Sequence, residues 1–280
     1  MRLKFTKMQG AGNDFVVIDG ISQNFDPNSE TIRRLADRHF GIGADQILLV
    51  EKTHLAGVDF RYRIFNADGH EVEQCGNGAR CFARFVVDKG LTNKSRIRVE
   101  TKKRVIEPEI LEDGRVKVMM GAPSLNPDDL PFLAHQLLST KKADLPLWEY
   151  ENVKFGALSM GNPSAVIFVD NVDETDVEGI GRKICFAPCF PQQTNVVFLE
   201  INDAHRARVR VFERGAGETL ACGSGTCSGI VASMLARKTN TFVDVQARGG
   251  MLQIQWSGEL TAPVYLVGDA VSVFDGEILL

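Results

Sequence analysis

Two segments of the sequence decide the fold: CGNGARCFARFVVDKG at residues 75–90 and CGSGTCSGIVASMLARK at residues 222–238. Each begins with Cys-Gly-x-Gly and continues with residues that are apolar on nearly all faces of a helix, a pattern typical of a helix buried on every side. Each pattern ends at a charged residue or a glycine, which are signals for the end of a helix. The sequence therefore predicts two buried helices, each starting at a cysteine.

Three further sequence motifs, called landmarks below, are also repeated, and they occur in the same order in both halves of the chain. GNDFVVID (12–19) matches GNPSAVIFVD (161–170), QILLVE (46–51) matches NVVFLE (195–200), and FRYRIFN (60–66) matches RVRVFE (208–213). Asn162 follows Asn13 by 149 positions, and Cys222 follows Cys75 by 147. Four landmarks in register predict a gene-duplicated protein of two similar domains related by a pseudo-twofold axis.

Most of the remaining pattern predicts short strands, which alternate between apolar and polar residues. Further strands are expected at 96–101, 115–119 and 242–246, and amphipathic helices at 29–39 and 176–183. The proline-rich stretch APSLNPDDLPF (122–132) is interpreted as the linker between the halves. A central helix wrapped by strands, once in each half, fits this arrangement.

Composition excludes several classes of protein. The 280 residues include 32 Lys and Arg against 36 Asp and Glu, a formal net charge of −4, whereas a nucleic-acid-binding protein needs a clustered basic surface. The first residues contain no apolar signal segment, and the uncharged stretch 219–236 is better explained as a buried helix with its entry loop than as a membrane span. We expect a cytoplasmic protein without nucleic-acid or membrane partners.

The six cysteines lack the spacing of a metal site. None forms a Cys-x2-Cys pair, so a structural zinc site is not expected, and a disulfide framework is not expected in a reducing compartment. Cys185 and Cys189 are interpreted as small buried apolar residues. Cys75 and Cys222 differ because each precedes a helix, whose first N–H groups bind anions and lower the pKa of a nearby thiol.

Two such cysteines, placed by a duplication, predict a two-base reaction. If the two helix N-termini face each other across a cleft between the domains, one thiolate can remove the α-proton of a bound amino acid while the opposite thiol supplies a proton to the other face. The pair then titrates as a coupled unit, and the helix ends stabilise the charge that develops on the substrate carboxylate.

Polar residues recur beside these helices where a core would be apolar. For an isolated Asn, a turn or cap role is the better explanation, but the repetition favours an amino-acid site. Arg214 has the planar donor geometry for a second carboxylate, and Glu213 and the amides suit an ammonium group, which together predict a diamino diacid. The candidates are Asn13, Gln46, Asn66, Asn162, Asn195, Glu213 and Arg214.

The strings MQGAGNDF, YRIFNADGHEVEQCGNGARCFARF, MGNP and RVFERGAGETLACGSGT resemble those of the diaminopimelate epimerases over nearly the whole chain. The resemblance implies an α+β fold of two domains, each a β-barrel around a central helix, with residues 1–121 plus 267–280 in one and 122–266 in the other. It implies cofactor-independent interconversion of LL- and meso-diaminopimelate, for lysine and peptidoglycan precursors, by a cytoplasmic homodimer that needs no metal.

By the same resemblance, Cys75 and Cys222 are the acid/base pair. The backbone amides that bind the reacting carboxylate come from Gly76, Asn77, Gly223 and Ser224, and the seven polar candidates above bind the rest of the substrate. One position departs from the family pattern: Ser164 follows Gly-Asn-Pro where the family usually has His. Since a hydroxyl cannot carry a positive charge, we expect Glu213 and the helix ends to supply more of the tuning of the cysteine pKa values.

Other functions are weaker alternatives. A proline racemase or hydroxyproline epimerase would share the fold and the two cysteines but not a doubly charged substrate. A thiol hydrolase would need a histidine base, and no histidine lies in a repeated landmark. A non-catalytic amino-acid-binding protein would leave the two cysteines without a purpose, and GAGNDF lacks the third glycine of a dinucleotide-binding loop.

Overall fold

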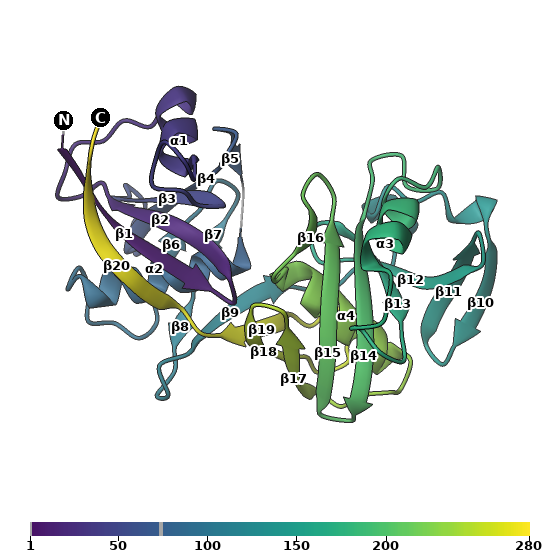
Figure 1. Ribbon diagram of the computed structural model, residues 1–280. Helices are drawn as coiled ribbons and strands as arrows, with labels where there is room; N and C mark the ends of the chain where they lie inside the picture. The colour runs from purple at the N-terminus through teal and green to yellow at the C-terminus, as the bar shows by residue number, and fades with distance from the viewer. Residues whose placement is uncertain (1, 73–74) are drawn as a thin grey trace. The chain divides into compact units, whose positions relative to one another are not determined.

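The computed structural model describes residues 2–72 and 75–280 (Figure 1). The chain divides into unit 1, Met1–Met119 with Val267–Leu280, and unit 2, Met120–Leu266. It passes from unit 1 to unit 2 within strand β9 (Val116–Gly121) and returns within β19 (Val264–Gly268). Unit 2 is thus continuous in sequence, whereas unit 1 is assembled from both ends of the chain.

Unit 1 is a mixed sheet with the order β20-β1-β2-β3-β4-β6-β7, and β5 pairs with β4. Strand β20 lies along β1 in antiparallel register, as Figure 1 shows in yellow and purple. The bounds are β1 Arg2–Gly10, β2 Asn13–Asp19, α1 Ser29–Ala36, β3 Gln46–Glu51, β4 Phe60–Asn66, β5 Glu71–Val72, α2 Gly76–Asp88, β6 Val99–Glu100, β7 Val105–Ile106, β8 Glu109–Ile110 and β20 Val271–Leu279.

Unit 2 repeats this plan in the order β10-β11-β12-β13-β14-β15-β17-β18-β19, and β16 pairs with β15. The bounds are the 3-10 turns η1 Pro127–Asp129 and η2 Ala134–Gln136, then β10 Leu138–Lys142, β11 Leu145–Tyr150, β12 Val153–Ser159, β13 Pro163–Phe168, α3 Val177–Cys185, β14 Asn195–Asp203, β15 Arg206–Glu213, β16 Gly217–Thr219, α4 Gly223–Leu235, β17 Phe242–Ala247 and β18 Gly250–Gln255.

The strand register confirms the duplication. In unit 1, Phe15 pairs with Gln46 between parallel strands β2 and β3; in unit 2, Ser164 pairs with Asn195 between parallel strands β13 and β14. Each parallel pair is followed by an antiparallel strand and then by another parallel one. The two sheets therefore place the repeated landmarks at equivalent positions.

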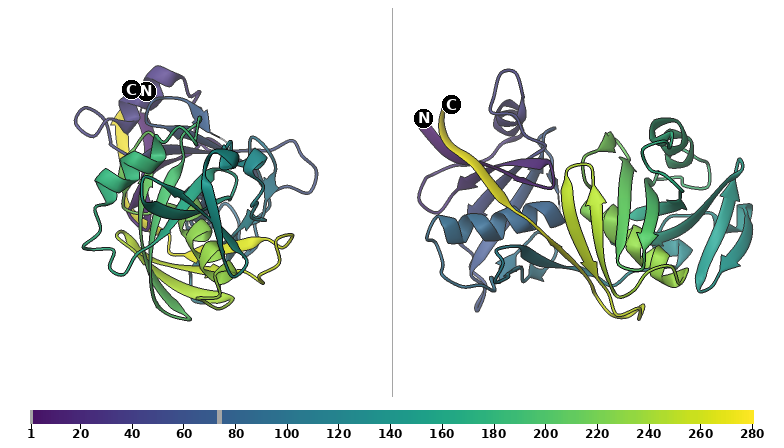
Figure 2. Two further views of the ribbon diagram at one scale, coloured as in Figure 1. Left: turned by 90° about the vertical axis from the view of Figure 1, so that its right-hand side faces the viewer. Right: turned by 60° about the horizontal axis from the view of Figure 1, so that its bottom comes forward.

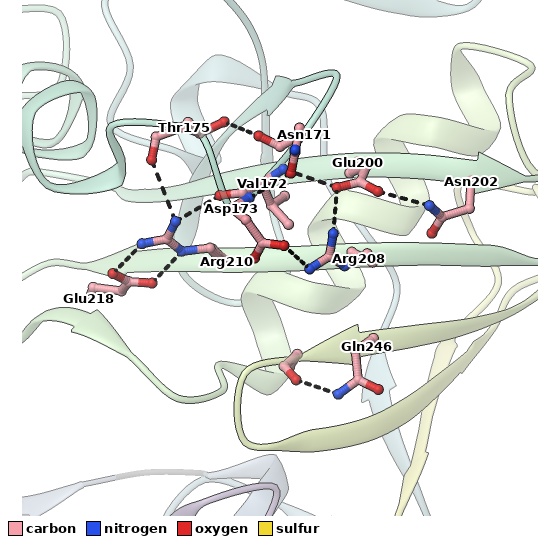
Figure 3. A network of polar contacts seen from close by, with 11 residues as sticks. Asn171, Val172, Asp173, Thr175, Glu200, Asn202, Arg208, Arg210, Glu218 and Gln246 are labelled. Atoms are coloured by element: carbon pink, nitrogen blue, oxygen red, sulfur yellow. Dashed lines mark hydrogen bonds and ion pairs between the residues drawn. The ribbon is translucent and has the colours of Figure 1, made fainter.

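Ion pairs on the sheets are duplicated as well. Arg63 donates two hydrogen bonds to Glu71, at 3.1 and 2.8 Å, and so ties β5 to β4. Arg210 makes the same two-bond contact with Glu218, at 2.6 and 2.8 Å, and ties β16 to β15 (Figure 3). In both pairs the arginine holds the pKa of the glutamate below its usual range. These pairs fix the short strand that precedes each cysteine.

Each unit has one long helix packed against its sheet. Helix α2 packs against β1, β2, β3 and β20, and α4 packs against β12, β13, β14, β15 and β18; the right-hand view of Figure 2 shows α2 running along its sheet. Both predicted central helices are confirmed, and so is the duplicated α+β fold. Helix α4 buries nearly all of its residues. Helix α2 also buries Arg80, a cation inside an apolar pattern.

Two of the secondary-structure predictions need correction. The strand expected at 96–101 is reduced to Val99–Glu100, because Arg96 forms only an isolated bridge to Glu109. The stretch 122–132 is not a free linker but part of unit 2: Ser124 pairs with Ser159, and Leu130 and Phe132 are buried in its core. The proline-rich pattern alone does not predict that Leu130 and Phe132 are buried.

We expect Phe132→Ala to destabilise unit 2. The Phe132 ring stacks on Phe190 with 4.7 Å between centroids and meets Trp148 edge-on at 4.9 Å, so its removal should lower the free energy of unfolding by about 3–5 kcal/mol. Urea unfolding followed by tryptophan fluorescence measures this, because Trp148 and Trp256 both lie in unit 2. The control Phe40→Ala, at an 87% exposed position, should change it by less than about 0.5 kcal/mol.

Candidate active site

Cys75 caps the N-terminus of α2 from an extended conformation, with φ −139° and ψ 118°. Its Sγ accepts a hydrogen bond from the N–H of Gly78 at 3.3 Å. A Cβ on Gly78 would lie 2.4 Å from the Tyr62 hydroxyl, so only glycine fits between the helix start and β4. Gly76 and Asn77 form the first turn of α2, where N–H groups have no partner within the helix.

Cys222 holds the equivalent position in unit 2. It caps α4 with φ −121° and ψ 110°, and Gly223 and Ser224 form the first turn. The Sγ lies 3.6 Å from the Ser224 hydroxyl and 3.9 Å from Nδ2 of Asn195. The residue is only 6% exposed. Each cysteine therefore sits at the positive end of a long helix, as the sequence predicted.

The expected lowering of the thiol pKa does not hold at Cys222. Burial raises its pKa well above the usual value, and the nearby carboxylate of Glu213 raises it further. The Ser224 hydroxyl and the N–H of Gly225 favour the thiolate but are outweighed. The position at a helix N-terminus does not prevent this rise, because removing water from around a charged sulfur disfavours the thiolate.

Glu213 is held in place beside Cys222 by β16. The Thr219 hydroxyl donates to Glu213 Oε1 at 2.6 Å. Thr219 belongs to β16, which the Arg210–Glu218 pair fastens to β15 (Figure 3). Arg208 on β15 in turn contacts Glu200 on β14 and Asp173. The polar network of unit 2 thus fixes the position of the carboxylate that faces the thiol.

Of the unit 1 amides, Asn13 lies next to Cys75, and Gln46 and Asn66 contact each other. Gln46 Nε2 donates to Asn66 Oδ1 at 2.8 Å, while Gln46 Oε1 is buried and has no hydrogen-bond partner among the residues that the structure describes. Asn13 Oδ1 lies 3.7 Å from Cys75 Sγ and 3.4 Å from Asn77 Nδ2. The buried, unsatisfied oxygen of Gln46 is suited to a ligand that donates hydrogen bonds.

In unit 2 the corresponding amides are Asn162 and Asn195. Asn195 Oδ1 accepts from the backbone N–H of Arg214 at 3.0 Å, and the exposed Arg214 guanidinium donates to Gln192 O at 3.1 Å. Asn162 Oδ1 is buried and, within residues 2–72 and 75–280, has no hydrogen-bond partner. Each unit therefore presents one unpaired amide oxygen, on residues that the sequence singled out.

Ser164 lies on β13 and is fully buried. Its hydroxyl accepts a hydrogen bond from Ser228 of α4 at 3.0 Å, and in the described part of the chain it makes no hydrogen bond to Cys222. This contact is not apparent in the sequence, because Ser228 is one of several small residues in the pattern of a buried helix.

Sequence reasoning missed Arg80 and Asp45, which bracket the unit 1 amides. Asp14, Asp45, Arg38 and Lys7 form an ion-pair cluster next to Asn13, with N–O distances of 2.6–2.9 Å. Burial raises the pKa of Asp14, but hydrogen bonds from Arg38 and Lys7 outweigh it and hold that pKa well below its usual range. Asp45 could have been found from the sequence, because it is a charged residue directly before Gln46.

No metal site is found in the described residues: no group of three or more His, Cys, Asp or Glu side chains could hold an ion. In the same part of the chain, no helix is long and apolar enough to cross a membrane.

Known proteins resemble the chain over its full length. The family model described as "Diaminopimelate epimerase" matches residues 5–126 and 156–273. Proteins of that name from Aromatoleum aromaticum and Chromobacterium violaceum are 54% identical, over 99% and 100% of both chains respectively. Among solved structures, a Bacillus anthracis protein of the PhzF phenazine-biosynthesis family aligns with TM-score 0.70 and 18% identity, covering 100% of both chains.

A hydroxyproline epimerase from Agrobacterium vitis aligns with TM-score 0.66 and 12% identity, covering 99% of this chain and 92% of that one. At 18% and 12% identity, these two solved structures show that the chain shares their fold.

We expect Glu213→Gln to increase the reactivity of Cys222. The substitution removes the charge that raises the Cys222 pKa but keeps an oxygen for Thr219. If that pKa falls by one unit, the thiolate fraction at pH 8, and with it the rate of alkylation by iodoacetamide, should rise about tenfold. Peptide mass spectrometry measures the rate at Cys222 alone. The surface variant Glu178→Gln should leave it unchanged, and an equal rise there would contradict the prediction.

Proposed function

Because the chain belongs to the diaminopimelate epimerase family, we propose that it interconverts LL- and meso-diaminopimelate, a step toward lysine and peptidoglycan precursors, without a cofactor. The observation that carries the proposal is the pair of duplicated half-sites. In each unit a cysteine caps a buried helix, and one amide oxygen of a repeated polar residue, Gln46 or Asn162, is buried without a hydrogen-bond partner among the described residues. Membership of the family, with 54% identity to proteins of that name, supports the substrate.

In the proposed reaction the α-carbon is approached by Cys75 on one face and by Cys222 on the other. The thiolate of one cysteine takes the α-proton and becomes a thiol, and the carbanion takes a proton from the opposite thiol, which becomes a thiolate. The net charge is unchanged, and the configuration of the carbon is inverted. A thiol and a thiolate are needed together, so the pair titrates as a unit.

The first-turn amides of the two helices bind the reacting carboxylate in this proposal. They belong to Gly76, Asn77, Gly223 and Ser224. A carboxylate there gains from both helix dipoles as negative charge grows on it in the transition state.

The remaining groups suit the two ammonium groups and the distal carboxylate of the substrate. The unpaired oxygens of Gln46 and Asn162 are acceptors for ammonium N–H groups. Asn66, which contacts Gln46, and the other repeated polar residues Asn13, Asn195 and Glu213 are proposed to bind the substrate with them. Arg214 offers a guanidinium to the distal carboxylate. A monocarboxylate such as proline would leave that guanidinium without its partner.

Incubation with LL-diaminopimelate in deuterated water tests this function. We expect deuterium at one α-carbon without added cofactor, and a loss of turnover by at least about a thousandfold in both Cys75→Ala and Cys222→Ala, because each removes a proton carrier. Nuclear magnetic resonance measures the exchange. Preferential deuteration of proline would assign the chain to the racemases that share its fold.

We propose that Glu213, and not Ser164, sets the pKa of Cys222, because the Ser164 hydroxyl cannot carry a charge. A histidine at this position should shift the pH–rate profile, because imidazole adds a group that titrates near pH 6.5. Since the Ser164 hydroxyl is buried and accepts from Ser228, the variant to use is Ser164→His with Ser228→Ala, which removes the hydroxyl that contacts position 164. Ser228→Ala alone is the control. A profile identical to that of the control would refute the proposal.

We further propose that the protein acts as a homodimer in the cytoplasm. Strand β20 lies at the edge of the unit 1 sheet and exposes Val271, Val273, Phe274 and Leu279, at 44–65%. An exposed apolar edge strand favours pairing with a second copy. Light scattering of the purified protein should give twice the mass of the chain, and Phe274→Asp should shift it toward the monomer.

A further inference from the structure

A chain of polar side chains runs past Cys75 in unit 1. The buried guanidinium of Arg80 donates to Asn77 Oδ1 at 2.9 Å. Asn77 Nδ2 donates to Asn13 Oδ1 at 3.4 Å, and Asn13 Nδ2 donates to Asp45 Oδ2 at 2.8 Å. Every hydrogen bond in the chain therefore points the same way, from Arg80 to Asp45.

The two ends of the chain fix this direction. A guanidinium can only donate hydrogen bonds, and an ionised carboxylate can only accept them. Asp45 is kept in place by Arg38, whose Nη2 lies 2.8 Å from its Oδ1, and by the backbone N–H of Asp14 at 3.1 Å from its Oδ2. Turning the Asn13 amide over would set its NH2 group against that of Asn77 and its oxygen against Asp45. The oxygen of Asn13 is therefore the atom that faces Cys75, at 3.7 Å.

An amide oxygen in this position acts on the protonation of the sulfur. It accepts a hydrogen bond from a thiol but repels a thiolate, so it favours the protonated form. The N–H of Gly78 acts in the opposite sense. Two titratable groups that interact with Cys75 are Tyr62 on β4 and Cys81 on α2. Burial raises the pKa of both, to about 12 for Cys81, so both are neutral at pH 7.

Unit 2 lacks this chain. By the spacing of the repeat, Cys227, Ser224, Asn162 and Thr194 stand where unit 1 has Arg80, Asn77, Asn13 and Asp45. None of the four carries a fixed charge. At Cys222 it is the NH2 group of Asn195 that faces the sulfur, because its oxygen accepts from Arg214 N. The duplication has kept the cysteines but has placed opposite ends of an amide beside them.

We propose that Arg80 and Asp45 are positioning residues, which hold the Asn13 amide with its oxygen toward Cys75 and so keep Cys75 protonated in the free enzyme. The inference concerns the free enzyme and rests on the proposed function only in taking Cys75 as one of the two proton carriers. The protonation state itself can be measured without substrate. Failure of this inference and failure of the proposed function are thus separate results.

The test is the pH dependence of alkylation of Cys75 by iodoacetamide, read by peptide mass spectrometry. In Asp45→Asn the side chain can donate as well as accept, so the Asn13 amide is no longer held from that end. We expect the pH of half-maximal reactivity at Cys75 to fall by about one unit, a tenfold rise in rate on the low-pH side. The rate at Cys222, in the other unit of the same molecule, should change by much less than the rate at Cys75, because Asp45 makes its contacts in unit 1.

Asp14→Asn is the matched control for charge. It removes a carboxylate from the same cluster, and Asp14 makes no hydrogen bond to Asn13 through its side chain. We expect its shift to be less than a third of that of Asp45→Asn. Equal shifts would show a simple charge effect and would overturn the inference, as would no shift in Asp45→Asn or an equal change at Cys222.

Asn13→Asp provides a second, independent measurement if Asp45→Asn does not fold by circular dichroism. A carboxylate oxygen in place of the amide oxygen should raise the half-maximal pH at Cys75 by at least one unit. An unchanged or lower value would overturn the inference, because it would mean that the atom of residue 13 facing the sulfur does not control its proton. Turnover of diaminopimelate by the wild type is measured separately.

Discussion

Both halves of the molecule depend on a buried helix that starts at a cysteine. The first N–H groups of α2 and α4 have no partner within the helix, and Cys75 Sγ supplies one acceptor, to Gly78 N. The glycine at the third helical position is required for this, since a Cβ would meet Tyr62 in unit 1 and come within 3.2 Å of Val211 in unit 2. The strands that carry the polar residues are arranged around these two helix starts.

The duplication has preserved the scaffold and changed the polar groups near the sulfurs. The pairing of β2 with β3 and of β13 with β14, and the Arg63–Glu71 and Arg210–Glu218 pairs, are equivalent in the two units. Glu213 stands beside Cys222, whereas Asn66 occupies its place near Cys75. Two equal half-sites could not tell one face of a carbon from the other, so the differences between them are where selectivity has to reside.

The sequence predicted the fold well because its repeats fix register, and register determines which residues share a sheet. It predicted that Asn13, Gln46 and Asn66 belong together, and they lie in one unit. It did not predict a role for Arg80, because a single cation does not change the apolar pattern of a helix. The contact between Arg80 and Asn77 is seen only in the structure. It was wrong about the pKa of Cys222, because the helix N-terminus is visible in sequence whereas the extent of burial is not.

The return of the C-terminal strand to the first unit has a consequence for synthesis on the ribosome. Strand β20 pairs with β1 from Arg2↔Leu279 to Gln9↔Val271, so the sheet of unit 1 is completed only after residues 271–279 have left the exit tunnel. Unit 2 is continuous from Met120 to Leu266 and can fold while β1 still lacks its neighbour. The order of translation therefore makes unit 2 the first to yield a finished domain, and leaves the edge of β1 in need of protection until β20 has been synthesised.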